Sequence, residues 1–393
     1  MEFTEPFPFK SPITSSQIII FFISFEMQPK TSLILFSLFA LALISSTHSR
    51  HLWGGASSYF LHGLKKQDRL AVLQAAKDAD LKVIRIFITG VFWHSHGTDI
   101  DEIKDLESWP GSYNDKILNQ IDDLMAEAKN YGIKLIIAMH DRYALTHKAE
   151  AYVKKYNIKT VGESNNVNDA SAFYTNKEAQ ADFDRRLVHI LNHKNPHFNN
   201  RPWSELSEVV FSFEAQNEAM GHMPLANINW QCDRAKVIKQ YVKNGILVST
   251  GGGVDFDTSS KIQYFQCPYL NVISLHTYDY DANKIGQKVS EAKNLAFKYG
   301  KRIIVEEFGA KGGDKKNILA RQIAAIKNQG VPWIVWQILK PGKGAQDYEI
   351  WTNEDSWWNT VNPRGKETAS TKHGWDWPEI WNGDSDGGKG SSW

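Results

Sequence analysis

The amino-acid sequence predicts an α/β fold with a single (β/α)8 barrel, the TIM barrel. Short apolar runs alternate with amphipathic helical patterns from His51 onward, which is typical of repeated β/α units around a parallel sheet. Eight such runs can be counted, and eight units in roughly 330 residues fit one closed barrel with some long loops. A doubly wound sheet would usually show fewer strands and an early Gly-rich phosphate turn, which does not follow the first runs.

The eight expected strands are rich in β-branched, aliphatic and aromatic residues, as strands buried on both faces of a parallel sheet are. They are 52–59, 83–88, 134–139, 209–213, 246–249, 272–275, 302–305 and 333–336. Gly251-Gly252-Gly253 follows the fifth run. A phosphate cradle is the alternative reading there, but the Lys and Ser/Thr of a P-loop are absent, so a simple loop is predicted.

Helices are expected where apolar residues recur at three and four positions. The clearest patterns cover 66–79, 114–130, 178–191, 282–299 and 315–328. Two loops are unusually long, 141–176 after the third strand and 339–370 after the eighth. Long loops on the carboxyl side of the strands shape the substrate cleft of a barrel.

Composition limits the range of partners. The chain has 45 basic and 44 acidic side chains, so a charge-driven partnership with nucleic acid or membrane is not expected. It has 14 Trp residues, enough to fill a core and also to line a groove that stacks on flat ligand faces. Cys232 and Cys267 permit one disulfide, although spacing alone cannot establish their pairing.

The N-terminal 49 residues predict an extension that carries a secretion signal. Lys30 precedes an apolar segment at 32–44 that is too short to span a bilayer, and small polar residues follow it. Because this pattern starts at Met27, translation could begin there. We expect a secreted, extracellular chain without a membrane anchor after cleavage, a barrel domain over 50–380 and a disordered tail over 381–393 rich in Gly, Ser and Asp.

The most informative stretch follows the fourth strand. The run at 209–213 ends in the polar pair Asn217-Glu218, and a TIM barrel carries its chemistry at such a strand end. A structural alternative is that Glu218 only caps the next helix.

Other polar or aromatic residues also fall at the ends of expected strands, and they should converge on the same mouth of the barrel. A single one could be a structural hydrogen-bonding group, but this explanation weakens for the set as a whole. The residues are Arg85, His140, Asn217, Glu218, His276, Tyr278, Glu306, Glu307 and Trp336.

This set resembles glycoside hydrolase family 5, the retaining β-glycanases of the cellulase and endo-β-mannanase superfamily, over the whole barrel. The family has eight nearly invariant active-site positions, and each has a candidate here in the same order: Arg85, His140, Asn217, Glu218, His276, Tyr278, Glu307 and Trp336. One departure is visible, because the family usually has Pro after the Asn-Glu pair and this chain has Ala219-Met220. The departure bears on substrate more than on chemistry.

The resemblance implies that Glu218 and Glu307 are the two catalytic carboxyl groups of a retaining enzyme. Glu218 would be the acid/base, with a pKa raised by an apolar and like-charged setting, and Glu307 the nucleophile. Glu306 is the alternative nucleophile, but neighbouring strand residues point to opposite faces, so only one of the two glutamates should reach the cleft.

The remaining positions would bind substrate. Asn217 would contact the sugar 2-hydroxyl, and Arg85 and Tyr278 would keep Glu307 ionised. His276 would contact the acid or the leaving sugar, and Trp336 would lie under the sugar ring. Five loop aromatics are candidates either for flanking subsites or for loop cores: Trp93, Tyr143, Trp351, Trp357 and Trp358.

No cofactor and no metal are expected. His94 and His96 have a spacing that can chelate a metal ion, but no third ligand is evident and the implied chemistry needs none. The sequence thus predicts a monomeric, secreted endo-β-glycanase acting on a polysaccharide or oligosaccharide.

Mannan endo-1,4-β-mannosidase is the leading expectation, because the segments at 54–60 and 306–309 look like those of fungal and plant mannanases. The alternatives are an endo-β-1,4-glucanase, a β-1,3/1,6-glucanase and a catalytically silent carbohydrate-binding barrel.

Overall fold

The described residues form a closed barrel of eight parallel strands. The computed structural model describes residues 51–159, 170–343, 347–372 and 374–381, and the expected signal peptide and almost all of the expected tail lie outside them. The strand order is β1-β12-β11-β10-β9-β8-β5-β2, which closes on itself. This confirms the predicted (β/α)8 fold.

All eight expected strands are present, with ends that differ from the predicted ones by at most three residues. In sequence order they are β1 (Gly54–Ser57), β2 (Val83–Phe87), β5 (Lys134–Ala138), β8 (Val210–Glu214), β9 (Leu247–Ser249), β10 (Val272–Thr277), β11 (Arg302–Phe308) and β12 (Trp333–Val335). Three two-stranded ribbons decorate the loops: β3 (Glu107–Trp109) with β4 (Ser112–Tyr113), β6 (Lys194–Asn195) with β7 (Arg201–Pro202), and β13 (Ile338–Leu339) with β14 (Ile350–Trp351).

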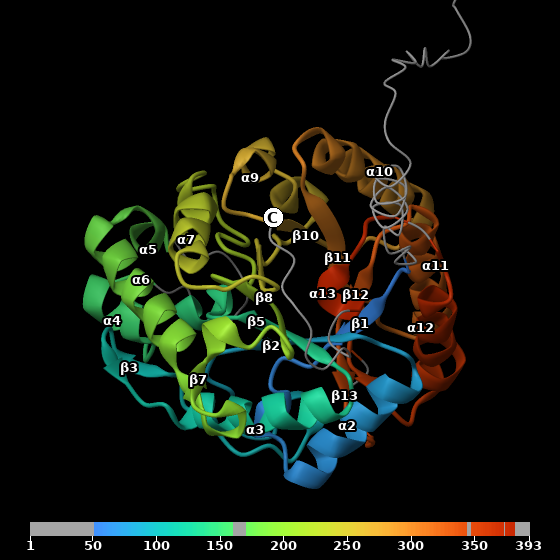
Figure 1. Ribbon diagram of the computed structural model, residues 1–393, viewed down its shortest axis with the longest axis horizontal. Helices are drawn as coiled ribbons and strands as arrows, with labels where there is room; N and C mark the ends of the chain where they lie inside the picture. The colour runs from blue at the N-terminus through green and yellow to red at the C-terminus, as the bar shows by residue number, and fades with distance from the viewer. Residues whose placement is uncertain (1–50, 160–169, 344–346, 373, 382–393) are drawn as a thin grey trace, which may run out of the picture. The chain divides into compact units, whose positions relative to one another are not determined.

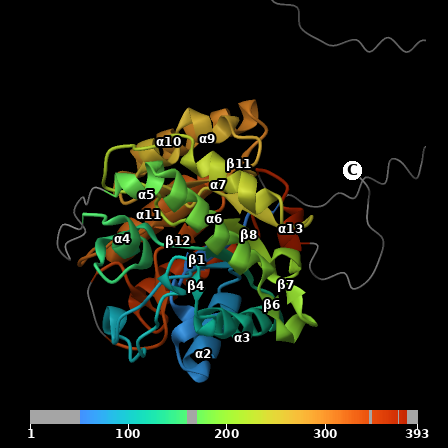
Figure 2. The same cartoon turned by 90° about the vertical axis from the view of Figure 1, so that its left-hand side faces the viewer.

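Helices surround the barrel strands in a ring (Figure 1). The larger ones are α2 (Lys66–Asp78), α3 (Lys116–Asn130), α6 (Lys177–Asn192), α7 (Trp230–Lys239), α10 (Ala282–Lys298), α11 (Lys315–Asn328) and α12 (Asn362–Ala369). The five predicted helices are among them. Figure 2 shows α2 and α3 together at one edge of the barrel and α9 (Ile262–Gln266) with α10 at the opposite edge.

The two long loops contain more regular structure than predicted. The first, at 141–176, contains the 3-10 helix η3 (Arg142–Thr146) and the helices α4 (Ala151–Tyr156) and α5 (Ser171–Thr175). The second contains the π-helical turn η6 (Trp357–Val361), which leads directly into α12. The loop expected over 339–370 therefore contains a helix in its second half. The sequence did not predict this helix because Pro363 and Gly365 have low helical propensity, and tertiary packing stabilises the helix instead.

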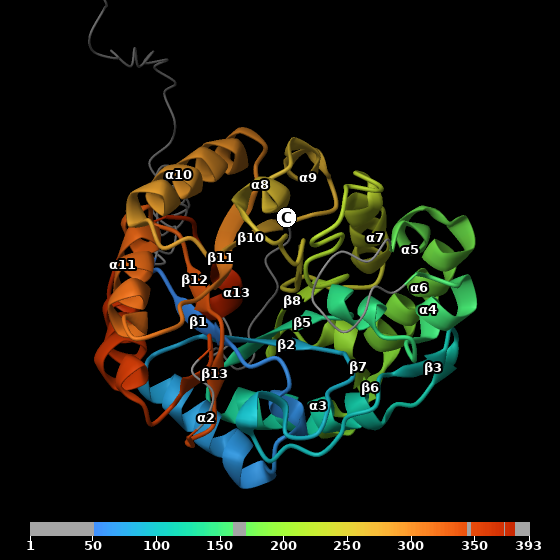
Figure 3. The same cartoon turned by 180° about the vertical axis from the view of Figure 1, so that it is seen from behind.

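Short elements complete the chain. They are η1 (Leu61–Gly63), η2 (Ser95–Gly97), η4 (Pro196–Phe198), η5 (Trp203–Glu205), α8 (Phe256–Ser259) and α13 (Pro378–Trp381). Figure 3 shows α8 and α9 beside β10. The disulfide Cys232–Cys267 joins α7 to the residue after α9, with 5.6 Å between the Cα atoms. Among the described residues, no helix has both the length and the apolar character that crossing a bilayer would require.

The two ends of the barrel differ in chemistry. Apolar side chains from the first three residues of seven strands pack inside it, together with Trp53 and Trp377. Trp53 meets Phe211 and Trp377 edge to face, with ring centroids 5.3 and 5.5 Å apart. A packed amino-terminal end serves stability and leaves the carboxyl end of the strands for chemistry.

Candidate active site

The segment after β8, residues 215–218, is hydrogen-bonded to the segments that follow both neighbouring strands, β5 and β9. The backbone N–H of Asn217 donates to the His140 carbonyl, and that of Glu218 donates to the Gly251 carbonyl, both at 2.9 Å. Glu218 has a φ of 45°, in the left-handed region that non-glycine residues seldom adopt. Such backbone strain is held only where the surroundings determine the conformation, so the carboxyl group of Glu218 has a defined direction.

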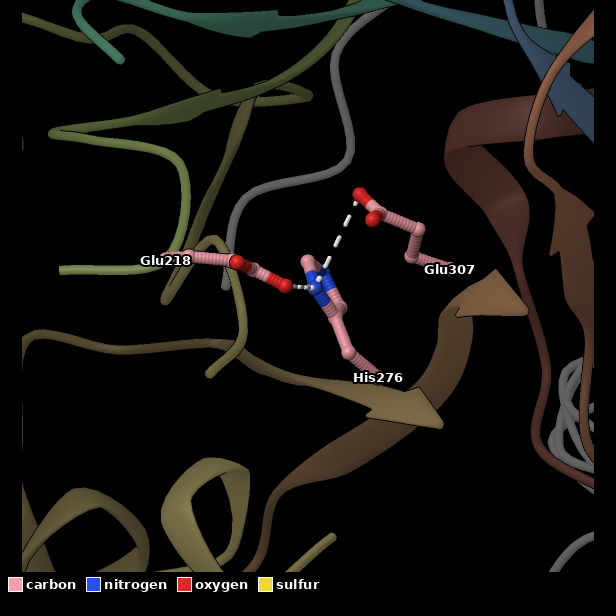
Figure 4. A group of neighbouring side chains, drawn as sticks. All are labelled: Glu218, His276 and Glu307. Atoms are coloured by element: carbon pink, nitrogen blue, oxygen red, sulfur yellow. Dashed lines mark hydrogen bonds and ion pairs between the residues drawn. The ribbon is translucent and has the colours of Figure 1, made fainter. Parts of the chain in front are cut away.

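Glu218, His276 and Glu307 lie together at this mouth (Figure 4). One oxygen or nitrogen atom of each lies within 4.8 Å of the others, and all three side chains are buried. Glu218 and Glu307 thus face each other at the spacing of a retaining glycosidase, in which the carboxyl groups are about 5–5.5 Å apart, and not at the about 6.5–9.5 Å of an inverting one.

The same spacing would suit a metal ion, but the donor atoms of this group already contact one another and nearby cations. Arg85 lies 2.9 Å from Glu307, and His276 lies 3.0 Å from Glu218. The hydrogen bonds and ion pairs among these side chains therefore account for their proximity.

Glu307 is held by a cation and by a phenol. Arg85 donates from Nη1 to Glu307 Oε2 at 2.9 Å, and the Tyr278 hydroxyl donates to Oε1 at 2.6 Å. Arg85 also donates to Glu214 and to the side-chain oxygen of Asn217, at 3.0 and 2.8 Å from Nη2. Both contacts to Glu307 favour its ionised form and aim it toward Glu218.

Glu218 receives hydrogen bonds on both oxygens. The Tyr143 hydroxyl donates to Oε2 at 2.5 Å, and His276 Nδ1 lies 3.0 Å from Oε1. Tyr143 was predicted only as a subsite or loop-core residue. Its place beside Glu218 could not be inferred because it depends on the path of η3.

The protonation pattern differs from the predicted one. Burial raises the pKa of Glu218, but hydrogen bonds from His276 and Tyr143 outweigh it, so the pKa of Glu218 is lowered, not raised. Burial raises the pKa of Glu307, and the charge of Glu218 adds to this against the opposing effect of His276 and Arg85. Burial lowers the pKa of His276, but Glu307, Glu218 and Glu306 raise it to about 10. These directions favour a protonated His276 beside an ionised Glu218, the reverse of the predicted protonated Glu218.

Glu306 also points into the barrel, although neighbouring strand residues were expected to point to opposite faces. Glu306 Oε2 lies 3.2 Å from His276 Nε2 and 3.4 Å from Arg85 Nε, while Glu307 contacts the same two residues. The register of β10 against β11 shifts after Leu275, which adds one residue to β11. Such a bulge breaks the alternation of side chains and is frequent beside active sites. Glu306 lies deeper, fully buried, whereas Glu307 is 5% exposed.

The ring of His140 packs into the protein beside the predicted site residues. It is fully buried, its Nδ1 lies 2.9 Å from Gln216 Nε2, and its ring stacks on Phe173 at 5.8 Å. The ring therefore lies between Gln216 and a group of buried aromatic side chains. The position of His140 at the end of β5 was predicted correctly, but not the direction of its ring.

Asn217 and Trp336 lie at the mouth. Asn217 accepts from Arg85 and donates to Asp141 at 3.0 Å. Trp336 is half-buried and stacks on Tyr59, with 5.7 Å between ring centroids and 6° between planes, and on Phe87 at 5.7 Å. These three rings form one aromatic cluster, and the Arg85 guanidinium lies 4.6 Å from the centre of the Phe87 ring.

Gly252 explains part of the glycine triplet. A Cβ atom there would lie 2.2 Å from the His276 ring, and the φ of 67° also favours glycine. The triplet is therefore a loop, as predicted, and its middle residue leaves room for His276.

The loop residues fall into two groups. Trp351 and Trp357 are buried in loop cores, whereas Trp93 and Trp358 are 68% and 57% exposed. Ala219 and Met220, the departure from the family pattern, are buried. They therefore influence loop shape more than direct contact.

The paired histidines do not act together. His96 contacts Glu349 through Nδ1 at 2.5 Å and Tyr59 through Nε2 at 3.1 Å, and His94 is exposed. Neither belongs, among the described residues, to a group of ligands close enough to hold a metal ion.

Sequence reasoning missed two further acidic residues at the site, Glu214 and Asp141. Asp141 directly follows His140, and Glu214 lies three residues before Asn217. An acidic residue at the end of a buried strand was the signal that could have identified Glu214.

The chain is similar in sequence to known glycoside hydrolases. Residues 46–341 match the Cellulase family (glycosyl hydrolase family 5). Mannan endo-1,4-β-mannosidase A of Aspergillus aculeatus is 23% identical over 236 residues, which cover 56% of this chain and 55% of that relative. The chain thus matches about half the length of this curated relative.

Solved structures share the fold. An endo-1,4-β-mannanase from Rhizomucor miehei is 18% identical with a TM-score of 0.63, over 82% of this chain and 96% of that one. A broad-specificity endoglucanase from Bacteroides salanitronis is 15% identical with a TM-score of 0.53, over 81% of this chain and 93% of that one. At these identities the likeness shows the fold alone.

Proposed function

This chain belongs to the cellulase family, glycosyl hydrolase family 5, and we propose that it is an endo-β-glycanase that hydrolyses β-1,4-mannan with retention of configuration. Retention is characteristic of the family. The observation that carries the proposal is the pair Glu218 and Glu307, which present oxygens within 4.8 Å of each other at the carboxyl end of the barrel.

Glu307 is the nucleophile in this proposal. Its carboxylate attacks the anomeric carbon as the bond to the leaving oxygen breaks, and a covalent glycosyl-enzyme forms. Arg85 stabilises the ionised form, because a guanidinium does not lose its proton in proteins. The hydroxyl of Tyr278 fixes the second oxygen, so the attacking oxygen has one direction.

Glu218 is the general acid, and then the general base that activates water in the second step. As an acid it must hold a proton, and the raised pKa of His276 and the lowered pKa of Glu218 favour that proton on His276 in the free protein. Moving it to Glu218 removes the negative charge that raises the pKa of Glu307 and also the positive charge of His276 that lowers it. Arg85 and the Tyr278 hydroxyl then remain to keep Glu307 ionised.

Asn217 and Trp336 complete the proposed sugar site. Asn217 offers its side-chain amide to the 2-hydroxyl, a contact that strengthens in an oxocarbenium-like transition state. Trp336 offers an indole face to the apolar face of the sugar ring. The exposed Trp93 and Trp358 are proposed to bind sugars further along the chain.

Mannan is proposed as the substrate on the similarity to the Aspergillus mannosidase and the Rhizomucor mannanase fold. The endoglucanase neighbour supports β-1,4-glucan as the second candidate. The test is turnover on β-mannan, carboxymethyl cellulose, laminarin and pustulan, with NMR of the first-formed anomer. Turnover of a glucan with none of mannan would reject mannan, and an inverted product would reject the double displacement.

We also propose that the protein is secreted, from the signal-like segment at 27–49. Amino-terminal sequencing of the protein from culture medium should find a start near residue 50. A start before about residue 44 would count against cleavage there.

A further inference from the structure

A second pair of glutamates lies beneath the proposed catalytic pair. Glu214 is the last residue of β8, and Glu306 is in the bulged part of β11. The two side chains hydrogen-bond to each other, and both are fully buried. Neither can touch a substrate, so any effect on the reaction must pass through a neighbour.

Glu306 contacts His276 and is fixed by other groups around it. Its Oε2 lies 3.2 Å from His276 Nε2, and its Oε1 accepts from the Ser274 hydroxyl at 2.8 Å. Burial raises the pKa of Glu306, but Arg85, Glu214 and His276 lower it to about 2. An ionised carboxylate can only accept hydrogen bonds, so His276 Nε2 must carry a hydrogen.

This fixes what the other ring nitrogen can do. With hydrogen on Nε2, His276 is either an imidazolium that donates from Nδ1 to Glu218 Oε1, or a neutral ring whose Nδ1 accepts from a protonated Glu218. The two arrangements contain the same number of protons. They differ only in the position of one proton along a contact of 3.0 Å.

We propose that Glu306 is a positioning residue that acts through His276, so that His276 Nδ1 and Glu218 share the proton that Glu218 delivers to the leaving sugar oxygen. The inference rests on the proposed role of Glu218 as the acid. In the first step the Nδ1–H bond breaks as the Glu218 O–H bond forms, and the glycosidic oxygen then takes this proton as its bond to the anomeric carbon breaks. In the second step the attacking water returns a proton to the pair.

The charges around the pair determine the direction of the pH effect. The groups that face Glu218, His276 and Glu306 are Arg85, Tyr143, Glu214, His222, Tyr278 and Glu307. Glu306 adds a negative charge 3.2 Å from the imidazole, which favours the proton-bearing pair. Removing this charge should let the shared proton leave at a lower pH.

The alkaline limb of the kcat/KM profile reports the loss of that proton. On β-mannan, or on the best glucan of the panel if mannan is inert, E306Q should shift this limb downward by about one pH unit or more. E306D keeps the charge and should leave the limb near its wild-type position, even if kcat falls. S212A alters a buried serine of β8 without changing a charge, and should also leave the limb in place.

An unshifted limb in E306Q would overturn the proposal, since a structural role would lower turnover without moving the pH profile. If E306Q does not fold, nitrogen-15 NMR of the wild-type histidine rings decides, with the signal assigned by its absence in H276N. Nε2 should remain protonated at every pH while Nδ1 changes. A neutral ring with hydrogen on Nδ1 would overturn the proposal. Full turnover of mannan by E218Q would instead reject the role of Glu218, a separate outcome.

Discussion

Arg85 Nη1 lies 2.9 Å from Glu307 Oε2, although 222 residues separate them in sequence. Arg85 belongs to β2 and Glu307 to β11, and closing the barrel brings their side chains to one mouth. A guanidinium in a fully buried position needs carboxyl partners: Glu306 and Glu307 supply negative charge, and Glu214, whose pKa is raised by burial, accepts two of its hydrogen bonds. The same ion contacts that satisfy a buried arginine therefore place the proposed nucleophile.

Replacing Glu307 by Gln should reduce kcat by at least about 1,000-fold, because an amide cannot form the glycosyl-enzyme. Sugar binding should remain, since the shape of the side chain is almost unchanged. Turnover of mannan and calorimetric binding of a mannan oligosaccharide measure the two effects. E291Q, which neutralises an exposed carboxyl group on α10, is the matched control and should keep both. If wild type and E307Q bind alike and are equally inert on every glycan, the protein is a carbohydrate-binding barrel.

The strands could be predicted because their residues are buried on both faces and leave continuous apolar runs. The run at 209–213, for example, differs from β8 by one residue at each end. Helix α12 was missed because Asn362–Ala369 is a polar sequence with no apolar periodicity. The helix α7 was missed for a similar reason, since its buried positions include Gln231 and Arg234.

The sequence predicted which strand ends carry the site residues, but not the directions in which their side chains point. His140 follows the end of β5, as predicted, but its ring packs between Gln216 and Phe173, a direction that the sequence did not predict. Alternation of side chains selected Glu307 and excluded Glu306, but a bulge in β11 turns both inward. Register shifts depend on pairing between strands, which a single sequence does not reveal.

Replacing Tyr143 by Phe should raise the pKa of Glu218, because the substitution removes a hydroxyl whose hydrogen bond stabilises the ionised form of Glu218. The acid would then keep its proton to higher pH, and the alkaline limb of kcat/KM should move upward by about one pH unit. This direction is opposite to that expected for E306Q. The new carboxylate formed on proton transfer is also less stabilised, so kcat should fall by about tenfold. A pH profile of Y143F on mannan checks both; a limb that does not move would show that the hydroxyl does not affect the acid.

Replacing Gly252 by Ala should disable the site by displacing His276. The new methyl group would lie 2.2 Å from the imidazole ring, so the ring must leave its contacts with Glu218 and Glu306. We expect kcat/KM to fall by at least about 100-fold, as small displacements of catalytic groups have such effects.

The control separates this clash from backbone strain. Gly300 has a φ of 63° and no atom within 4 Å of an added Cβ, so G300A carries the left-handed cost of about 1–2 kcal/mol without a clash. It should retain activity while losing some thermal stability. Equal loss of activity in G252A and G300A would show that strain, and not the position of His276, is responsible.

His62 should make the protein sensitive to acid. It is fully buried in η1, and neither ring nitrogen has a hydrogen-bond partner among the described residues. Burial, aided by the charge of Arg69, lowers its pKa to about 3. The unfolded chain, with a pKa near 6.5, therefore binds more protons between about pH 3 and 6.5, and stability is lost as the pH falls through this window. Between pH 7 and 4.5 the free energy of unfolding should fall by about 2–3 kcal/mol for this reason.

H62M replaces the ring by an apolar side chain of similar volume and should remove that part of the loss. Urea unfolding at both pH values measures it, with H94N, a change at an exposed histidine, as the control. An identical pH dependence in H62M and wild type would assign the acid sensitivity to other groups.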